Sequence, residues 1–220
     1  MSARIQDINH LLGIQSPWEV SEIKQDDATQ LAEIHVIFSE GSVLRCPECN
    51  KVCPGYDHRL RKWRHTDICE YQTTVVAKVP RVECSEHGIK TVSVPWADER
   101  VRFTTAFEAK VINWLLDTTS ISTVACRMGV SWTLIANIME RAVLRGRARK
   151  KEELIAHLCV DETSYKKGHN YITVVSNPDT ATVLYVGEGR TKASLKVRTR
   201  CCKYHPNQLR MSARVGQRPV

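Results

Sequence analysis

Two short pairs of metal-ligating side chains constrain the first half of this chain more than any other feature. The first pair is Cys46 and Cys49, and the second is Cys84 and His87; two residues separate the members of each pair. This spacing suits a tight knuckle, in which turning backbone points two side chains at one ion. Two knuckles supply four ligands, the number that zinc prefers in structural sites. The sequence therefore predicts one structural Zn²⁺ held by these four residues.

Other cysteines and histidines compete as ligands. The gap between the two pairs is 34 residues, longer than in a simple ribbon. Cys53 is the strongest rival, because it follows Cys49 closely enough to chelate the same ion. The remaining rivals are His58, His65 and Cys69.

Basic residues crowd the segment after the first pair. They surround Trp63, and they are His58, Arg59, Arg61, Lys62, Arg64 and His65. A finger with this composition could lie along DNA phosphates. A solvated loop of long polar side chains is an equal alternative.

A change of apolar period marks a helical module from Phe103 onward. One helical face carries Phe103, Phe107, Val111, Trp114 and Leu115. Two more helices are expected, one over Ile121–Met128 and one from Trp132 to about Leu144.

Residues 121–140 fit the template of a helix-turn-helix. Ala125 is the small residue needed where the second helix crosses the first, and Gly129 can adopt the positive φ that the turn requires. Ser131 can cap the second helix. The positions expected to be buried are all apolar: Val124, Met128, Val130, Ile135 and Ile138. A structural hairpin within a larger helical bundle is the alternative.

The outward face of the second helix is the candidate DNA contact. In this motif such a face enters the major groove, and here it carries Ser131, Trp132, Thr133, Ala136 and Asn137. Glu140, which is unfavourable near phosphates, is expected off the contact face. Basic residues follow, and we predict that Arg145 and Arg147 contact phosphates. A solvated linker is the alternative for this basic stretch.

The net charge of +8 supports a nucleic-acid partner only weakly. Residues 196–220 hold seven Lys or Arg and no acidic residue, so the remaining 25 basic and 24 acidic residues give a net of +1. The local clusters carry the argument instead. Nine cysteines, without an apolar N-terminal signal or a run long enough to cross a membrane, indicate a reducing compartment and metal binding.

The pattern returns to strands after the basic stretch. The runs "HLCV", "NYITVV" and "ATVLYV" predict three antiparallel strands, with Asp161 at the end of the first. An RNase H-like fold begins in this way, and there carboxylates converge on two Mg²⁺ ions for phosphodiester chemistry.

The order of modules and two motifs resemble the DDE transposases of bacterial insertion sequences, most closely the ISL-three family with its N-terminal zinc finger. The "VDE…KGH.Y" motif is matched by Val160, Asp161, Glu162, Lys167, Gly168, His169 and Tyr171, and "GEGR.KASL" by residues 187–195. The resemblance implies that Asp161 is the first catalytic acid and that Mg²⁺ serves the full-length family. It also implies a bacterial cytoplasmic location and, as partner, double-stranded DNA at the terminal inverted repeats. His87 departs from the pattern, since a cysteine is more usual there.

The resemblance stops after Leu195, where the family continues to a second Asp and a final Glu. Residues 196–220 contain no acid and are typical of out-of-frame translation, with a natural basic DNA-binding tail as the alternative. Of the other acids, Glu162 points away from Asp161, Asp179 lies in a turn, and Glu188 is the only replacement candidate.

Together these patterns predict an α+β chain of several modules. We expect an N-terminal helix and β-hairpin in residues 1–40, a zinc-binding β module in 41–100, a helix-turn-helix module in 101–151, an incomplete RNase H-like sheet in 152–195 and a basic tail in 196–220. The predicted function is that of a truncated transposase, which binds DNA but does not catalyse. A zinc and helix-turn-helix transcriptional regulator is the alternative. The oligomeric state stays open, with a homodimer as one option.

Overall fold

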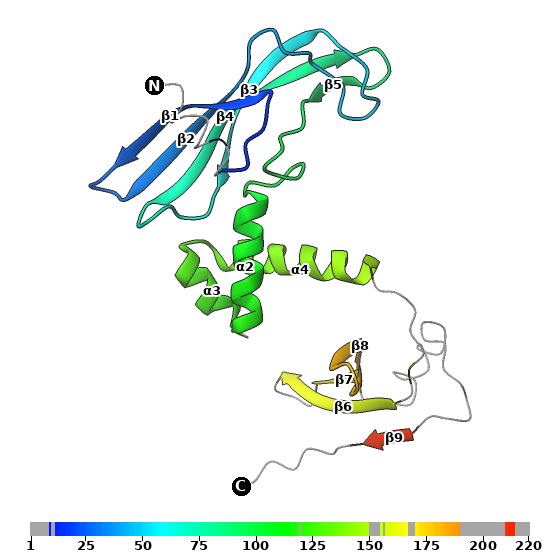
Figure 1. The fold of residues 1–220 in the computed structure, drawn as a ribbon. Helices are drawn as coiled ribbons and strands as arrows, with labels where there is room; N and C mark the ends of the chain where they lie inside the picture. Colours follow the sequence, from blue (N-terminus) through cyan, green and yellow to red (C-terminus); the bar gives the residue numbers. More distant parts are fainter. Residues whose placement is uncertain are drawn as a thin grey trace. The chain divides into compact units, whose positions relative to one another are not determined.

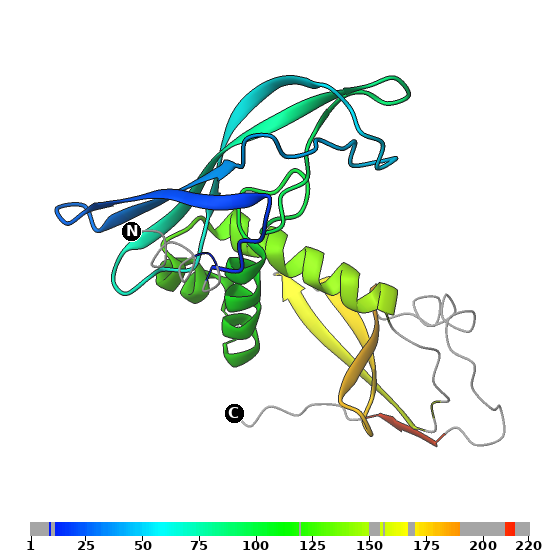
Figure 2. The same cartoon turned by 45° about the horizontal axis from the view of Figure 1, so that its top comes forward.

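The computed structural model describes most of the chain in two compact units, residues 1–145 and 146–220, which are considered separately (Figures 1 and 2). The described residues are 9, 12–118, 120–149, 155, 157–166, 170–189 and 210–213. Apart from Asn9, the expected N-terminal helix lies outside them. None of the described helices is long and apolar enough to cross a membrane.

The first unit contains a five-stranded sheet. Its strands are β1 (Trp18–Asp26), β2 (Leu31–Phe38), β3 (Gly55–Arg64), β4 (Gln72–Cys84) and β5 (Gly88–Thr91). The order is β1-β2-β4-β3, and β5 also pairs with β4. β1 and β2 form the antiparallel hairpin expected from the sequence, and β2 pairs in parallel with β4. The long strand β4 therefore joins the N-terminal hairpin and the cysteine-rich segment in one sheet.

Three tryptophans form the centre of the sheet's hydrophobic core. Trp96 lies edge-to-face with both Trp18 and Trp63, at ring-centroid distances of 5.0 Å and 5.5 Å. Each such pair contributes roughly 0.5–1.5 kcal/mol beyond the burial of its area. The solvated loop considered for residues 58–65 is wrong, because residues 58–64 belong to β3 and Trp63 is fully buried. Alternation along the strand explains why a tryptophan sits among so many basic residues.

Three helices follow the sheet: α2 (Thr105–Asp117), α3 (Ile121–Met128) and α4 (Trp132–Arg149). Phe107 and Val111 on the expected face of α2 are fully buried. The bounds of α3 are as predicted. α4 extends past Leu144 to Arg149, so the basic stretch is helical up to there and is not a linker. Arg and Ala are good helix formers, and the single Gly146 does not end the helix.

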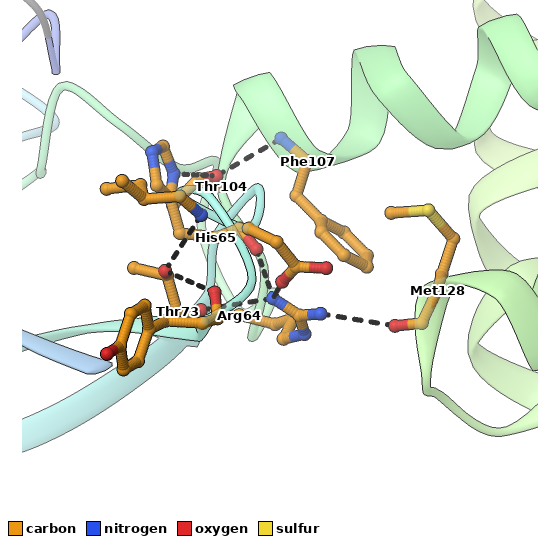
Figure 3. Close-up of polar contacts among 9 residues, drawn as sticks. Arg64, His65, Thr73, Thr104, Phe107 and Met128 are labelled. Carbon is orange, nitrogen blue, oxygen red and sulfur yellow. Dashed lines mark hydrogen bonds and ion pairs between the residues drawn. The ribbon is translucent and has the colours of Figure 1, made fainter. Parts of the chain in front are cut away.

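Arg64, at the end of β3, joins the sheet to the helices (Figure 3). Its guanidinium donates hydrogen bonds to the backbone carbonyls of Thr73 and Met128, both at 3.2 Å. It also pairs with the carboxylate of Asp67 at 2.6 Å and lies 5.0 Å from the ring centroid of Phe107. Met128 is the last residue of α3, and the last carbonyls of a helix have no partner within the helix. Arg64 supplies that partner and fixes the end of α3 against the sheet.

His65 makes a second connection, to the start of α2 (Figure 3). It is buried, and its Nδ1 lies 2.9 Å from Oγ1 of Thr104. The same oxygen accepts a hydrogen bond from the backbone N–H of Phe107 at 3.2 Å and caps α2. Burial, and then the neighbouring charge of Arg64, lower the pKa of His65. The imidazole is therefore neutral near pH 7, and Nδ1 can accept the hydrogen bond from the Thr104 hydroxyl.

The second unit contains a four-stranded sheet. Its strands are β6 (His157–Lys166), β7 (Asn170–Asn177), β8 (Thr182–Glu188) and β9 (Arg210–Ala213), in the order β8-β7-β6-β9. β6, β7 and β8 pair antiparallel as expected, whereas β9 pairs in parallel with β6. The three expected strands are therefore confirmed, and β9 is a fourth strand that the sequence analysis did not predict. The sequence of β9 gave no signal, because it is four residues long and lies in a basic stretch.

Candidate metal centre and nucleic-acid interface

The four predicted metal ligands converge at one point. The ligand atoms of Cys46, Cys49, Cys84 and His87 all lie within 4.8 Å of one another. Nδ1 of His87 is 3.7 Å from Sγ of Cys46 and 3.6 Å from Sγ of Cys84, and the Sγ atoms of Cys49 and Cys84 are 3.7 Å apart. With zinc bonds of about 2.3 Å to sulfur and about 2.0 Å to nitrogen, tetrahedral ligands lie about 3.5–3.8 Å apart. The cluster fits a structural Zn²⁺.

Turning backbone creates this geometry. In the first knuckle the N–H of Asn50 donates to the carbonyl of Cys46 at 2.9 Å, and Asn50 has a φ of 59°. In the second knuckle Gly88 has a φ of 66°, a left-handed conformation that glycine adopts at low cost. An ion pair between Lys51 and Glu86 connects the two knuckles. Asparagine and glycine both tolerate this left-handed conformation, so each knuckle can turn tightly.

The local environment favours a thiolate at Cys84. Hydrogen bonds from the backbone N–H groups of Glu86 and His87 lower the pKa of Cys84 to about 6. A thiolate is the form of cysteine that binds metal. Here β4 ends at Cys84, so the second knuckle places amide N–H groups around its sulfur.

Cys53 lies beside the cluster but outside the set of convergent ligands. It is 9% exposed, and its thiol donates a hydrogen bond to the carbonyl of Lys51 at 3.4 Å. Burial raises its pKa, which favours the protonated form. Of the other rivals, His65 is hydrogen-bonded to Thr104 through Nδ1, and Cys69 is exposed.

Glu48 lies behind His87, a neighbour that the sequence did not reveal. Its carboxylate lies 3.6 Å from Nε2 of His87 and 2.5 Å from Nζ of Lys90. A carboxylate behind a metal-binding histidine fixes the orientation of the ring and the position of its proton. With Nδ1 facing the cluster, Glu48 favours the proton on Nε2.

The helix-turn-helix has the turn that its sequence requires. Gly129 has φ 60° and ψ 38°, the left-handed conformation, and ends α3. Ser131 accepts a hydrogen bond from the N–H of Leu134 at 3.2 Å and so caps α4. Four of the five positions expected to be buried are buried, and the fifth, Val130, is half-buried. Ala125 is buried as well.

The predicted DNA contacts differ in their surroundings. At the start of α4, Ser131, Trp132, Thr133 and Asn137 are exposed, and Ala136 is half-buried. Farther along, Arg147 is exposed, whereas Arg145 lies 2.9 Å from Oε1 of the buried Glu108 on α2. Arg141 also contacts Glu108, at 3.3 Å. These two arginines therefore hold α4 against α2, a role that the sequence did not reveal.

Asp161, the predicted catalytic acid, lies within β6 and not at its end. β6 continues to Lys166, because residues 163–165 are β-branched, small and aromatic. Asp161 is exposed, faces Val174 across the ladder, and accepts a hydrogen bond from the N–H of Glu162 at 2.9 Å. Oδ2 of Asp179 lies 2.9 Å from Nδ1 of His157.

Three family models match successive parts of the chain. Residues 42–87 match the zinc-finger of transposase IS204/IS1001/IS1096/IS1165, and residues 92–143 match the helix-turn-helix domain of transposase family ISL3. Residues 158–211 match the transposase domain of the same family. The chain belongs to the ISL3 family of transposases. The resemblance to the ISL-three family found in the motifs is therefore confirmed. The last match runs past Leu195, and an out-of-frame origin for the tail stays a prediction.

Curated relatives are longer than this chain. The transposase for insertion sequence element IS1557 of Mycobacterium tuberculosis, from strains CDC 1551 / Oshkosh and ATCC 25618 / H37Rv, is 32% identical over 194 residues, which are 84% of this chain and 43% of the relative. The transposase for insertion sequence element IS1001 of Bordetella parapertussis is 27% identical over 157 residues, which are 70% of this chain and 38% of the relative. The chain spans less than half the length of these ISL3-family relatives.

The metal centre gives the first prediction. Purified protein should contain close to one zinc per chain by elemental analysis, and Cys49→Ala or Cys84→Ala should lose it, because each removes one of four convergent ligands. Cys53→Ala is the matched control and should keep the metal. Zinc loss in Cys53→Ala together with retention in Cys84→Ala would show that the ligand set is wrong.

Proposed function

We propose that this chain is the DNA-binding part of an insertion-sequence transposase and that α4 enters the major groove at the element's terminal inverted repeats. The observation that carries this proposal is the complete helix-turn-helix, with Gly129 in the turn, Ser131 as the cap and an exposed face at the start of α4. Its place between a zinc-finger match and a transposase match supports the same assignment.

In this proposal the segments have separate tasks. The zinc module in residues 41–100 supports the helix-turn-helix module in 101–151, which binds DNA. Residues 152–195 begin an RNase H-like catalytic domain, which in a longer family member would cleave and transfer DNA strands with Mg²⁺. A bacterial cytoplasmic location follows from a chromosomal DNA partner.

Base recognition by α4 gives the second prediction. Asn137→Ala should weaken binding to a duplex of one element end by about 1–3 kcal/mol, the value of a bidentate contact between asparagine and adenine. The affinity for a duplex of equal composition and scrambled order should stay unchanged. Fluorescence anisotropy with both labelled duplexes measures the difference.

Two further variants make this experiment decisive. Lys110→Ala removes an exposed cation on α2 and should leave both affinities unchanged. Arg147→Ala should weaken both duplexes equally, as expected of a phosphate contact. Unchanged binding to the element end by the Trp132→Ala, Thr133→Ala and Asn137→Ala variants would refute the recognition face. A footprint at a promoter-proximal operator, and none at the inverted repeats, would favour a transcriptional regulator.

We also infer that residues 1–220 by themselves do not catalyse strand cleavage. Two-metal chemistry needs ions about 3.5–4 Å apart, held by carboxylates from separate elements. Glu188 is on the same face of the sheet as Asp161. It pairs with Ile172 of β7, and Ile172 pairs with Thr163 of β6. Glu188 is therefore two strands and two residues away from Asp161. At strand spacings of about 4.8 Å and a rise of about 3.4 Å per residue, the Cα atoms of Asp161 and Glu188 are about 12 Å apart. Two carboxylates so far apart cannot share an ion.

On the other side of Asp161, the described strand also offers no carboxylate. β9 pairs in parallel with β6 there, with Ala213 opposite Val160. Residues 196–220 contain no acidic residue, so neither β9 nor the chain beside it can supply one. Such a chain would occupy element ends and act as a passive competitor of an intact transposase.

The third prediction follows from this geometry. The purified chain, incubated with a supercoiled plasmid that carries both element ends and with Mg²⁺ or Mn²⁺, should give no nicked product above the level of Asp161→Asn. The Asp161→Asn variant keeps the shape of the side chain and removes its charge. Metal-dependent nicking that disappears in this variant would contradict the inference.

A further inference from the structure

A groove runs beside the predicted recognition helix. Its volume is about 450 Å³. One wall is the segment 100–103, which leads into α2. The other wall is one stripe of α4 side chains, formed by Leu134, Asn137, Glu140, Arg141 and Leu144. Asn137, the candidate base contact, therefore shares this groove with Arg100 and Arg102.

The backbone of this wall is fixed to the sheet. The N–H of Arg64 donates to the carbonyl of Arg102 at 2.8 Å, and the N–H of Thr104 donates to the carbonyl of Arg64 at 2.9 Å. Phe103 is buried, whereas Arg102 is exposed, as expected from alternation along extended backbone. Arg100 has a φ of 62°, a left-handed conformation that residues other than glycine seldom adopt. The wall is an ordered part of the fold that presents two arginines.

The side chains that line the groove carry a net positive charge, which favours binding of an anion. Arg141 is neutralised by Asp98 at 2.5 Å and by Glu108 at 3.3 Å. The other cations that line the groove are Arg100 and Arg102, and Glu140 is the acid on the opposite wall. Arg61 lies near this wall: burial and then the charge of Arg102 lower the pKa of Arg61, and Glu99 opposes the shift. Like charges brought together in this way favour binding of a negatively charged partner.

We propose that Arg100 and Arg102 bind the sugar-phosphate backbone of double-stranded DNA beside the DNA major groove that α4 enters. This inference rests on the proposed function, because it takes α4 as the recognition helix. Phosphate contacts fix the register of a protein on the duplex, and base contacts select the sequence. Arg100 and Arg102 would add affinity for any duplex without selecting its sequence, whereas Asn137 would meet a base edge.

The salt dependence of binding tests this proposal in the full chain. The affinities of Arg100→Ala, Arg102→Ala and the double variant are measured over a range of salt for the element-end duplex and the scrambled duplex. Each single variant should reduce the slope of log affinity against log salt by about 0.9, and the double variant by about 1.8. The ratio between the two duplexes should stay unchanged. Arg102→Lys, which keeps the charge, should restore the slope.

Two variants of other residues complete the test. Lys78→Ala removes an exposed cation from β4 outside the groove and should leave the slope unchanged. Glu140→Gln removes the acid of the groove and should strengthen binding to both duplexes. Circular dichroism and zinc content confirm that each variant is folded.

The outcomes separate this proposal from the proposed function. Wild-type binding with an unchanged slope in the double variant would overturn the phosphate contacts and leave DNA binding intact. A change in the ratio between the two duplexes would also overturn it, because it would mean that the arginines read bases. Failure of the wild-type chain to bind either duplex would reject the proposed function itself.

Discussion

The guanidinium of Arg64 is the contact on which the arrangement of the first unit depends. It reaches from the end of β3 to the last carbonyl of α3, directly before the turn of the helix-turn-helix. Its backbone also holds the segment 102–104, and the next residue, His65, holds the N-cap of α2. An uncharged side chain could not satisfy several carbonyls and the Asp67 carboxylate together. The helices that are proposed to meet DNA are thus oriented by Arg64, the last residue of β3, and by His65, which follows it.

This link relates the metal centre to the DNA-binding face. β3 and β4 pair antiparallel, so the second zinc knuckle at Cys84 lies near Gly55, at the start of β3, and Arg64 lies at the other end of the pair, opposite Thr74. A metal that fixes the Cys84 end of β4 is therefore connected to Arg64 through the length of the β3–β4 pair. The zinc module of this ISL3-family chain then acts as a support for the helices, and most of its basic residues have structural partners. Lys62, for example, pairs with Glu33 at 2.6 Å.

The features predicted from the sequence are those with short-range signals. The knuckle spacings identified the four ligands that the structure brings together, and Gly129 with the apolar spacing around it identified α3 and the turn. The features that were missed depend on partners far away in the chain. Nothing near Arg64 in the sequence points to Met128, and nothing near Arg145 points to Glu108. β9 was missed because its partner strand, and not its own sequence, defines it.

Unfolding followed with two probes tests most directly whether Arg64 couples the zinc module to the helices. Urea titration of the full chain is monitored by far-ultraviolet circular dichroism for the helices and by a chromophoric chelator for zinc release. The two curves should coincide in the wild-type chain and in Arg59→Met, which changes an exposed arginine of the same strand. In Arg64→Met the helical signal should disappear at a lower urea concentration than that of zinc release. Curves that still coincide in Arg64→Met would contradict this account.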